Sequence, residues 1–302
     1  MALSTLALAA CGGGEEDFTV SNPISVPTAY FAWMNTDIKE AWRAGFYGQG
    51  TQVIVVDDFT SDQTLRGNLG LEVNEQTHGA WVAQHVEMLA PAADIDRRDY
   101  AFDVAVPLAS GKLNVINLSY SIPDNLGPDA TINWGAREAS IISYAGGAAV
   151  VVKSAGNEGV AVGAPSNGSY DYLNRDFIGK PTAIFAGALS SHGSVSAPAS
   201  IASYSNIAGT DTRVQSQFLV VGVTGDTLAR GGTGLEGTSF AAPQISSYAA
   251  VLGSKFTNAT ATQITNQLLN TARTDTIRGY NVTIHGRGEA SLARALAPQS
   301  IN

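Results

Sequence analysis

The chain has 302 residues, of which 44% are hydrophobic and only 14% are charged, and its formal net charge is −9. This length is enough for one large domain, and low charge together with 32 glycines favours a compact fold over a disordered chain. The lysines and arginines are scattered without a basic run, which argues against a nucleic-acid partner.

The N-terminal residues resemble an export signal. Residues 1–10 are mostly small and apolar and precede the single cysteine, Cys11, in "MALSTLALAAC". This pattern resembles the lipobox of a bacterial lipoprotein signal, although no Lys or Arg precedes the apolar part. We therefore predict a signal segment at 1–10, lipidation of Cys11, a flexible tether at 11–27 and a folded domain at 28–302. A single cysteine excludes an intrachain disulfide.

Apolar periodicity after the tether predicts alternating helices and strands. A short amphipathic helix is expected within 35–50, with Thr36 or Asp37 at its start and Gly45 at its end. The apolar run at 51–58 predicts a strand buried on both faces, and 78–89 has a helical period. Further strands are predicted at 112–121, 148–159, 182–191 and 217–225, and further helices at 135–147, 242–256, 260–272 and 288–297.

This alternation predicts an α/β fold of three layers, in which a mostly parallel central sheet is covered by helices on both faces. In such a fold, functional residues gather beyond the carboxyl ends of the strands. Those strand ends and the helix starts that follow them are therefore the places to look for chemistry.

Three polar residues stand at such positions. Asp57 ends the strand "VIVVD", His78 opens the helix "HGAWVA", and Ser239 precedes the helix that follows "GTSFAAP". Taken singly, each fits an ordinary structural role, as a turn carboxylate, a polar helix start or a helix cap. Together they supply the carboxylate, the imidazole and the hydroxyl that nucleophilic acyl transfer requires.

The residues around Ser239 favour a nucleophile. Pro243 lies four positions after Ser239 and lacks the N–H that would bond the Ser239 carbonyl in a helix. We therefore expect a loosened first turn with Ser239 at its mouth. The free N–H groups and the dipole of the following helix would favour negative charge there.

The motifs "VIVVDDF", "THGAWVA" and "GTSFAAP", in this order, resemble the Asp, His and Ser motifs of the subtilisin-like serine peptidases, the S8 family. The resemblance covers about residues 28–298. It implies a serine endopeptidase with the triad Asp57, His78 and Ser239, which acts on peptide bonds without a cofactor.

Two more segments carry the resemblance. "NVINLSYS" is similar to the family's substrate-pairing strand, and "KSAGNEG" is similar to its oxyanion segment, which implies that the side-chain amide of Asn157 faces the developing oxyanion. The implied substrate-binding residues are Ser119, Tyr120, Ser121, Ala155 and Gly156. Residues 162–181 should line the pocket for the substrate side chain before the scissile bond, but they match no family pattern closely enough to predict the preferred side chain.

Several positions depart from the family pattern. Asp58 and Phe59 follow Asp57 where the family has Ser or Thr and then Gly. We interpret Asp58 as a solvated turn carboxylate rather than as an element that favours basic substrates. The helix after His78 runs directly into "APAADID", without the loop that binds structural calcium in many members, so no metal is predicted there. We attribute Gln244, which replaces the family's usual His, to packing.

The remaining histidines are given no role in the chemistry. His85 lies two turns beyond His78 on the same helix, roughly 10 Å away, which is too far for the two to share a metal ion. His192 and His285 lie in polar, loop-like sequence and are expected to be solvated.

The leading hypothesis is an exported serine endopeptidase, lipid-anchored to a membrane or cell surface, whose partners are protein or peptide substrates. Its catalytic segment is also similar to those of subtilase autotransporters. One alternative is a non-catalytic binding protein on the same scaffold, but the triad and Asn157 are all present. Another is a ligase or cyclase that resolves the same acyl-enzyme with an amine, but nothing in the sequence excludes water. The oligomeric state is not predicted.

Overall fold

The computed structural model describes residues 29–70 and 72–301. The predicted signal segment 1–10 and the predicted tether 11–27, including Cys11, lie outside the described residues. Within the described ranges, no helix combines the length and the apolar character needed to cross a membrane.

The centre of the molecule is a six-stranded sheet in the order β10–β9–β7–β5–β1–β4, and every neighbouring pair is parallel. Its strands are β1 Thr51–Asp57, β4 Asp94–Asp99, β5 Leu113–Leu118, β7 Val150–Ser154, β9 Ala183–Leu189 and β10 Phe218–Gly222. Two small antiparallel pairs lie outside this sheet, formed by β2 Leu65–Gly67 with β3 Asn74–Gln76 and by β6 Pro123–Asp124 with β8 Tyr170–Asp171.

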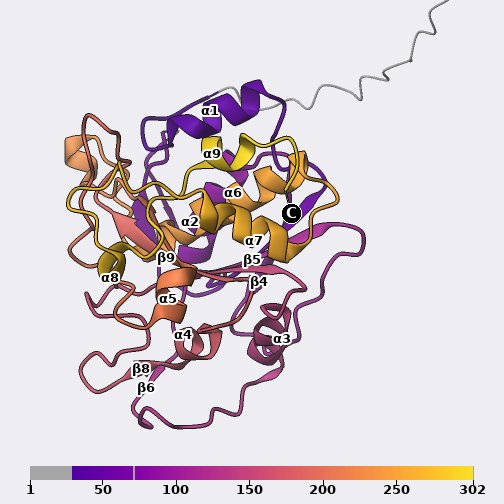
Figure 1. Ribbon diagram of the computed structural model, residues 1–302. Helices are drawn as coiled ribbons and strands as arrows, with labels where there is room; N and C mark the ends of the chain where they lie inside the picture. Colours follow the sequence, from indigo (N-terminus) through magenta and orange to yellow (C-terminus); the bar gives the residue numbers. More distant parts are fainter. Residues whose placement is uncertain (1–28, 71, 302) are drawn as a thin grey trace, which may run out of the picture.

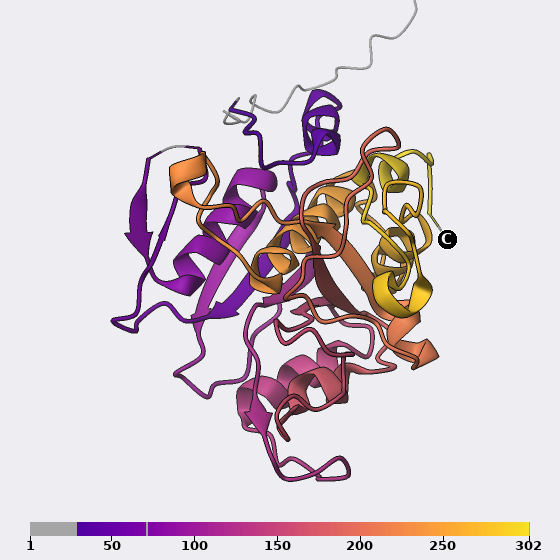
Figure 2. The ribbon, with the colours of Figure 1, turned by 90° about the vertical axis from the view of Figure 1, so that its left-hand side faces the viewer.

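Helices cover both faces of the sheet, which confirms the predicted three-layer α/β fold (Figure 1). One layer contains α1 Thr36–Arg43, α2 His78–Leu89, α6 Ala242–Lys255, α7 Ala261–Asn270 and α9 Leu292–Leu296. The other contains α3 Ala136–Tyr144, α4 Tyr172–Phe177 and α5 Thr212–Gln217. The short helix α8 Val282–His285 and the 3₁₀ turns η1 Leu228–Arg230 and η2 Thr238–Phe240 complete the described elements. A second view separates the α3–α4 layer from the layer with α2 and α6 (Figure 2).

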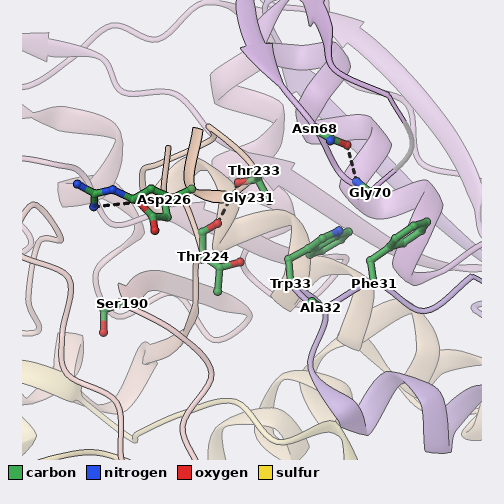
Figure 3. A pocket seen from close by; sticks show the side chains of 12 residues that line it. Phe31, Ala32, Trp33, Asn68, Gly70, Ser190, Thr224, Asp226, Gly231 and Thr233 are labelled. Atoms are coloured by element: carbon green, nitrogen blue, oxygen red, sulfur yellow. Dashed lines mark hydrogen bonds and ion pairs between the residues drawn. The ribbon is translucent and has the colours of Figure 1, made fainter. Parts of the chain in front are cut away.

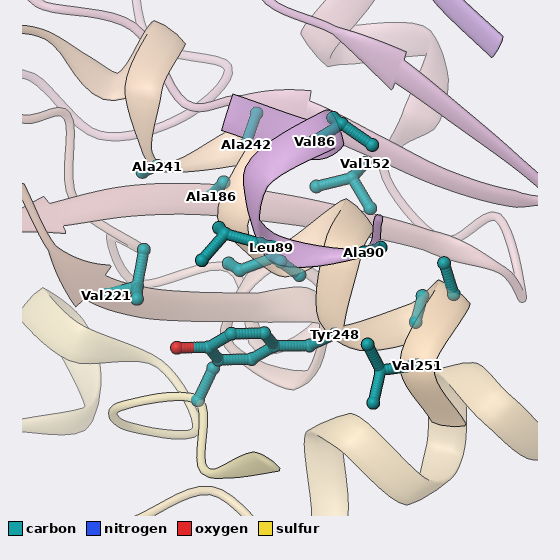
Figure 4. Close-up of a cluster of buried hydrophobic side chains, with 14 of the residues drawn as sticks. Val86, Leu89, Ala90, Val152, Ala186, Val221, Ala241, Ala242, Tyr248 and Val251 are labelled. Atoms are coloured by element: carbon teal, nitrogen blue, oxygen red, sulfur yellow. The ribbon is translucent and has the colours of Figure 1, made fainter. Parts of the chain in front are cut away.

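Alternate residues of the buried strands feed two hydrophobic cores. In β1, Val53 and Val55 face the α2–α6 side, and Ile54 and Val56 face the other side. On the first side, α6 is buried along almost its whole length. It packs against α2 and against the sheet (Figure 4). The helix that follows Ser239 is therefore a fixed part of the core.

The edge strand β4 is not predicted by the sequence pattern. Its sequence, "DIDRRD", is almost entirely charged, because β4 has only β1 as a neighbour and its side chains remain partly exposed. The described residues 100–112, which cross from β4 to β5, contain no helix. Val106 of this crossover is buried in the core on the α3 side.

The strand order determines where a site can form. From β1 the chain adds β4 on one side and then β5 on the other, so the segments that leave the carboxyl ends of β1 and β5 diverge. Ligands in open parallel sheets bind outside such a point of divergence. Asp57 is the last residue of β1, and Ser119 directly follows β5.

Candidate active site

The end of β1 and the start of α2 bring Asp57 and His78 together. Nδ1 of His78 lies 2.6 Å from Oδ1 of Asp57. A carboxylate can only accept, so Nδ1 of His78 donates, and Nε2 is left as the nitrogen that can take up a proton. The carboxylate is almost fully buried, whereas 28% of the imidazole side chain is exposed. The Asp57 carboxylate thus orients the imidazole, and part of the ring remains accessible to solvent.

Close backbone packing holds this pair in place. The N–H of Gly79 donates to the carbonyl of Asp58 over 2.8 Å, and a Cβ on Gly79 would lie only 2.6 Å from that oxygen. Only glycine therefore lets α2 begin so close to the end of β1. The N–H of Asp58 donates to Oδ1 of Asp57 over 2.7 Å, and Thr77 caps α2.

Asp58 corrects one expectation. Its carboxylate accepts from the N–H of Ser61 over 3.0 Å and from the Ser61 hydroxyl, as a turn residue should. The expectation that Asp58 is solvated was wrong, because the residue is buried.

Ser239 lies in the 3₁₀ turn η2, directly before α6. Because Pro243 has no N–H, the Ser239 carbonyl accepts instead from the hydroxyl of Ser119 over 2.9 Å. The Ser239 hydroxyl donates in turn to the carbonyl of Ser119 over 3.0 Å. The loosened first turn expected from the sequence is therefore present, and the Ser119 hydroxyl bonds the carbonyl that this turn leaves free.

Phe240 brings the imidazole beside this turn. The rings of His78 and Phe240 have centroids 5.6 Å apart. Among the described residues, no hydrogen bond joins Ser239 to His78, because the hydroxyl is turned toward Ser119. A rotation about χ1 of Ser239 is the movement that would redirect the hydroxyl.

Asn157 follows β7 and is held by the residue before Ser239. Its Oδ1 accepts from the N–H of Thr238 over 2.8 Å and from the Thr238 hydroxyl over 3.0 Å. With the oxygen held, the amide nitrogen of Asn157 is the end left to donate. Gly237 leaves room for this amide, since a Cβ there would lie 3.2 Å from Nδ2. The N–H of Gly156 donates to the same Thr238 hydroxyl over 3.1 Å.

Asn206 holds the segment around Asn157 through hydrogen bonds to its backbone, and the sequence did not predict this role. Its Nδ2 donates to the carbonyl of Ala155 over 2.9 Å, and its Oδ1 accepts from the N–H groups of Glu158 and Val160, both over 3.0 Å. In the sequence, "YSNIAG" looks like an ordinary loop. Only the tertiary fold shows that this asparagine shapes the loop that carries Asn157.

The five predicted substrate-binding residues lie on two neighbouring segments. Ser119, Tyr120 and Ser121 follow β5, while Ala155 and Gly156 follow β7. The phenol of Tyr120 is anchored away from them, because it donates to Oε1 of Glu138 over 3.0 Å. Burial, reinforced by the Glu138 carboxylate, raises the pKa of Tyr120 far above its usual value, so the phenol stays neutral.

His85 is held in the core by its contacts. Its Nδ1 donates to the carbonyl of Trp81 over 2.7 Å, and its ring stacks on Phe240 with centroids 5.1 Å apart. Burial lowers the pKa of His85 to about 4. Among the described residues, no group of three or more His, Cys, Asp or Glu side chains is arranged to hold a metal ion.

His192 and His285 are not solvated, and here the sequence-based expectation was wrong. His285 is 2% exposed beneath the ring of Tyr280, and burial lowers its pKa. Nε2 of His192 donates to the carbonyl of Trp33 over 3.1 Å, and its Nδ1 lies 3.3 Å from Nδ2 of Asn35. The side chain of His192 is 14% exposed, and its partners are distant in sequence, so its local context could not reveal that it is partly buried.

A pocket of about 590 Å³ is lined by other residues than those of this site (Figure 3). Phe31 and Trp33 line one side, and residues 231–233, which lead toward Ser239, line another. This pocket is not part of the site, because its lining does not include Asp57, His78, Asn157 or Ser239.

The model of the subtilase family, peptidase S8, matches residues 67–291, which is most of the chain. The chain therefore belongs to the subtilase family and is a serine-type peptidase. The matched range begins after Asp57, so the assignment of Asp57 to the site rests on its hydrogen bond to His78.

Solved structures share the fold at low sequence identity. A protease from Pseudoalteromonas arctica has a TM-score of 0.56 at 16% identity, with 89% of this chain and 95% of that chain covered. MycP1 from the ESX-1 type VII secretion system has a TM-score of 0.54 at 20% identity, covering 90% and 88%. The self-cleaved protease domain of PatA has a TM-score of 0.53 at 17% identity, covering 82% and 96%. No sequence of a curated protein matches the chain.

Proposed function

We propose that the chain is a serine endopeptidase in which Ser239 is the nucleophile, His78 the general base, Asp57 the residue that orients the base, and Asn157 an oxyanion donor. The observation that carries this proposal is the 2.6 Å bond between His78 and the buried Asp57, formed beside the turn that presents Ser239. Family membership supports the same chemistry.

The first half-reaction follows from these positions. The Ser239 hydroxyl leaves the carbonyl of Ser119, gives its proton to Nε2 of His78 and attacks the peptide carbonyl carbon. The oxyanion receives hydrogen bonds from Nδ2 of Asn157 and from the N–H of Ser239. The buried carboxylate of Asp57 stabilises the imidazolium, which then protonates the leaving amine. In the second half-reaction, Nε2 of His78 takes a proton from a water molecule that attacks the acyl carbon. The bond from this carbon to Oγ of Ser239 then breaks, His78 returns the proton to Oγ, and the carboxylic acid product leaves.

A fluorophosphonate probe tests this proposal, because it reacts only with an activated serine. We expect the wild type to be labelled at Ser239, the Ser239→Ala variant to remain unlabelled, and a control in α5, Ser216→Ala, to behave as wild type. Labelling of Ser239→Ala at the wild-type rate would end the nucleophile assignment. A peptide-library digest, with and without an added amine acceptor, then separates a hydrolase from a binding protein and from a ligase.

We also propose that the enzyme is exported and anchored through a lipid on Cys11, which the resemblance of residues 1–11 to a lipoprotein signal supports. Several acyl chains on one cysteine give the stable anchoring that a single chain does not. A Gly-rich coil as long as residues 12–27 spans roughly 20–25 Å in root-mean-square terms. Substrates at the same surface would then be met at high effective concentration.

Expression of the gene with its complete leader in a bacterium tests the anchor. The wild type should partition with membranes, whereas Cys11→Ser should not be processed to the lipid-modified form. Release of the wild type into the medium, with an N-terminus other than Cys11, would exclude the anchor. The peptidase assignment would survive that result.

A further inference from the structure

Lys153 is a buried cation that the mechanism above does not use. It follows three valines in strand β7, and its side chain is 1% exposed. Its Nζ lies 3.2 Å from Oδ2 of Asp171 and donates to the carbonyl of Ser154 over 2.8 Å. A buried ammonium is unfavourable unless it is paired, so its presence in this strand calls for a physical reason.

Asp171, its partner, connects two segments of the chain. Oδ1 of Asp171 accepts from the N–H of Ile122 over 3.2 Å and also caps α4. Its Oδ2 faces Lys153, whose Nζ bonds the carbonyl of Ser154. One carboxylate therefore reaches the segment after β5 directly and the segment after β7 through Lys153.

These two segments, 119–122 and 154–157, flank the nucleophile, and we call them the wall segments. Ser239 exchanges hydrogen bonds with Ser119 of the first wall segment. Thr238 is bonded to Gly156 and Asn157 of the second. The peptide carbonyl carbon attacked by Ser239 would lie next to both wall segments. The side chain of the residue that carries this carbonyl, the P1 side chain, would therefore lie against them. The Lys153–Asp171 pair joins the same two segments.

We propose that the Lys153–Asp171 pair sets the charge preference for the P1 side chain, an inference that rests on the proposed peptidase site. The two charges neutralise each other through the 3.2 Å ion contact, in which Oδ2 of Asp171 has no hydrogen bond of its own. Nζ of Lys153 and Oδ1 of Asp171 also bond backbone groups of the wall segments, so neither charge is left over for the substrate. A charged P1 side chain would lose its hydration and find no free opposite charge in the pair. The wild type therefore favours uncharged P1 side chains.

The inference is tested with peptides that differ only at P1, which is Gln, Lys or Glu. Lys153→Met keeps the length of the side chain but leaves the Asp171 carboxylate, which is 17% exposed, without its cation. We expect the ratio of kcat/KM for Lys over Gln to rise at least about tenfold in this variant. Asp171→Asn should have the opposite effect and raise the ratio of kcat/KM for Glu over Gln. The double variant should return both ratios to the wild-type values.

Lys112→Met is the matched control. Lys112 pairs with Asp94 at the opposite end of the sheet, directly before β5, so its removal changes the net charge equally but not the P1 ratios. A purely structural role for the pair would lower the rates for all three peptides together. An active Lys153→Met variant with the wild-type Lys-to-Gln ratio would overturn the inference, and so would a double variant that kept the shift.

The same substitutions on a Ser239→Ala background separate this inference from the proposed function. Affinities of the three peptides, measured by calorimetry, do not depend on turnover. A wild type that hydrolyses none of the peptides contradicts the proposed function, while a charge-dependent shift in affinity would still support the role of the pair. Absence of any peptide binding by the Ser239→Ala protein would overturn both. If Lys153→Met does not fold, Asp171→Asn and the double variant decide the question.

Discussion

Replacing His78 by Ala should slow peptide hydrolysis about as much as replacing Ser239 by Ala, and the double variant should be no slower than either single variant. The reason is that the base and the nucleophile act in one step, so the loss of either leaves the other without a task. The expected loss in kcat is on the order of 10⁶-fold, a magnitude known for subtilisin itself and borrowed here rather than derived from this geometry.

Single-turnover rates on one peptide substrate are the appropriate measurement, with the melting temperature of each variant as the test of folding. His78 is partly exposed at the start of α2 and Ser239 lies in a short turn, so neither replacement opens a large cavity in the core. A double variant that is much slower than both singles would mean that the two residues contribute separately, which contradicts a shared step.

Most of the fold could be predicted because its strands are nearly continuous apolar runs. The segment that became β1 is buried on both faces, as its composition requires, and α6 begins where Pro243 permits. The alternation of strands and helices along the chain was enough to indicate that the strands of the sheet are parallel. In these segments, local sequence and tertiary environment agree.

The rest of the fold lacked a local signal. Strand β4 consists mainly of charged residues and is a strand because β1 offers it a free edge. The crossover 100–112 covers the sheet without a helix, so no helical period marks it. The final helix begins at Leu292 rather than near 288, because Glu289 forms bridges with Val220 and Arg273 instead.

The candidate site divides in the same way. The short motifs around Asp57, His78 and Ser239 were enough to find the residues that would react. The residues that position them come from remote segments: Asn206 holds the loop of Asn157, and Asp171 ties the two wall segments together. A single side chain in a polar loop looks the same whether it is solvated or buried, which is why His192 was assigned wrongly.

Asn157→Ala should lower kcat by on the order of 10²–10³ while leaving KM nearly unchanged, a magnitude again borrowed from the equivalent donor in subtilisin. The full negative charge on the carbonyl oxygen exists only in the transition state, so a donor aimed at it contributes little to binding the ground state. The structure supports this aim, because Thr238 holds Oδ1 of Asn157 through two hydrogen bonds and leaves Nδ2 to donate.

Thr238→Val sharpens this prediction. It removes the hydroxyl that donates to Oδ1 of Asn157 but keeps the backbone N–H, so the amide loses one of its two supports. The loss in kcat should therefore be smaller than for Asn157→Ala. The Thr238 hydroxyl also accepts from the N–H of Gly156. On top of Asn157→Ala, the part of the loss that acts through the amide should therefore disappear, and only the part that acts through Gly156 should remain. An exposed asparagine outside the site, replaced as Asn125→Ala, should leave both kinetic constants unchanged. If Asn157→Ala raised KM and left kcat intact, the amide would be a ground-state contact, and the oxyanion would depend on the N–H of Ser239 and on groups not yet identified.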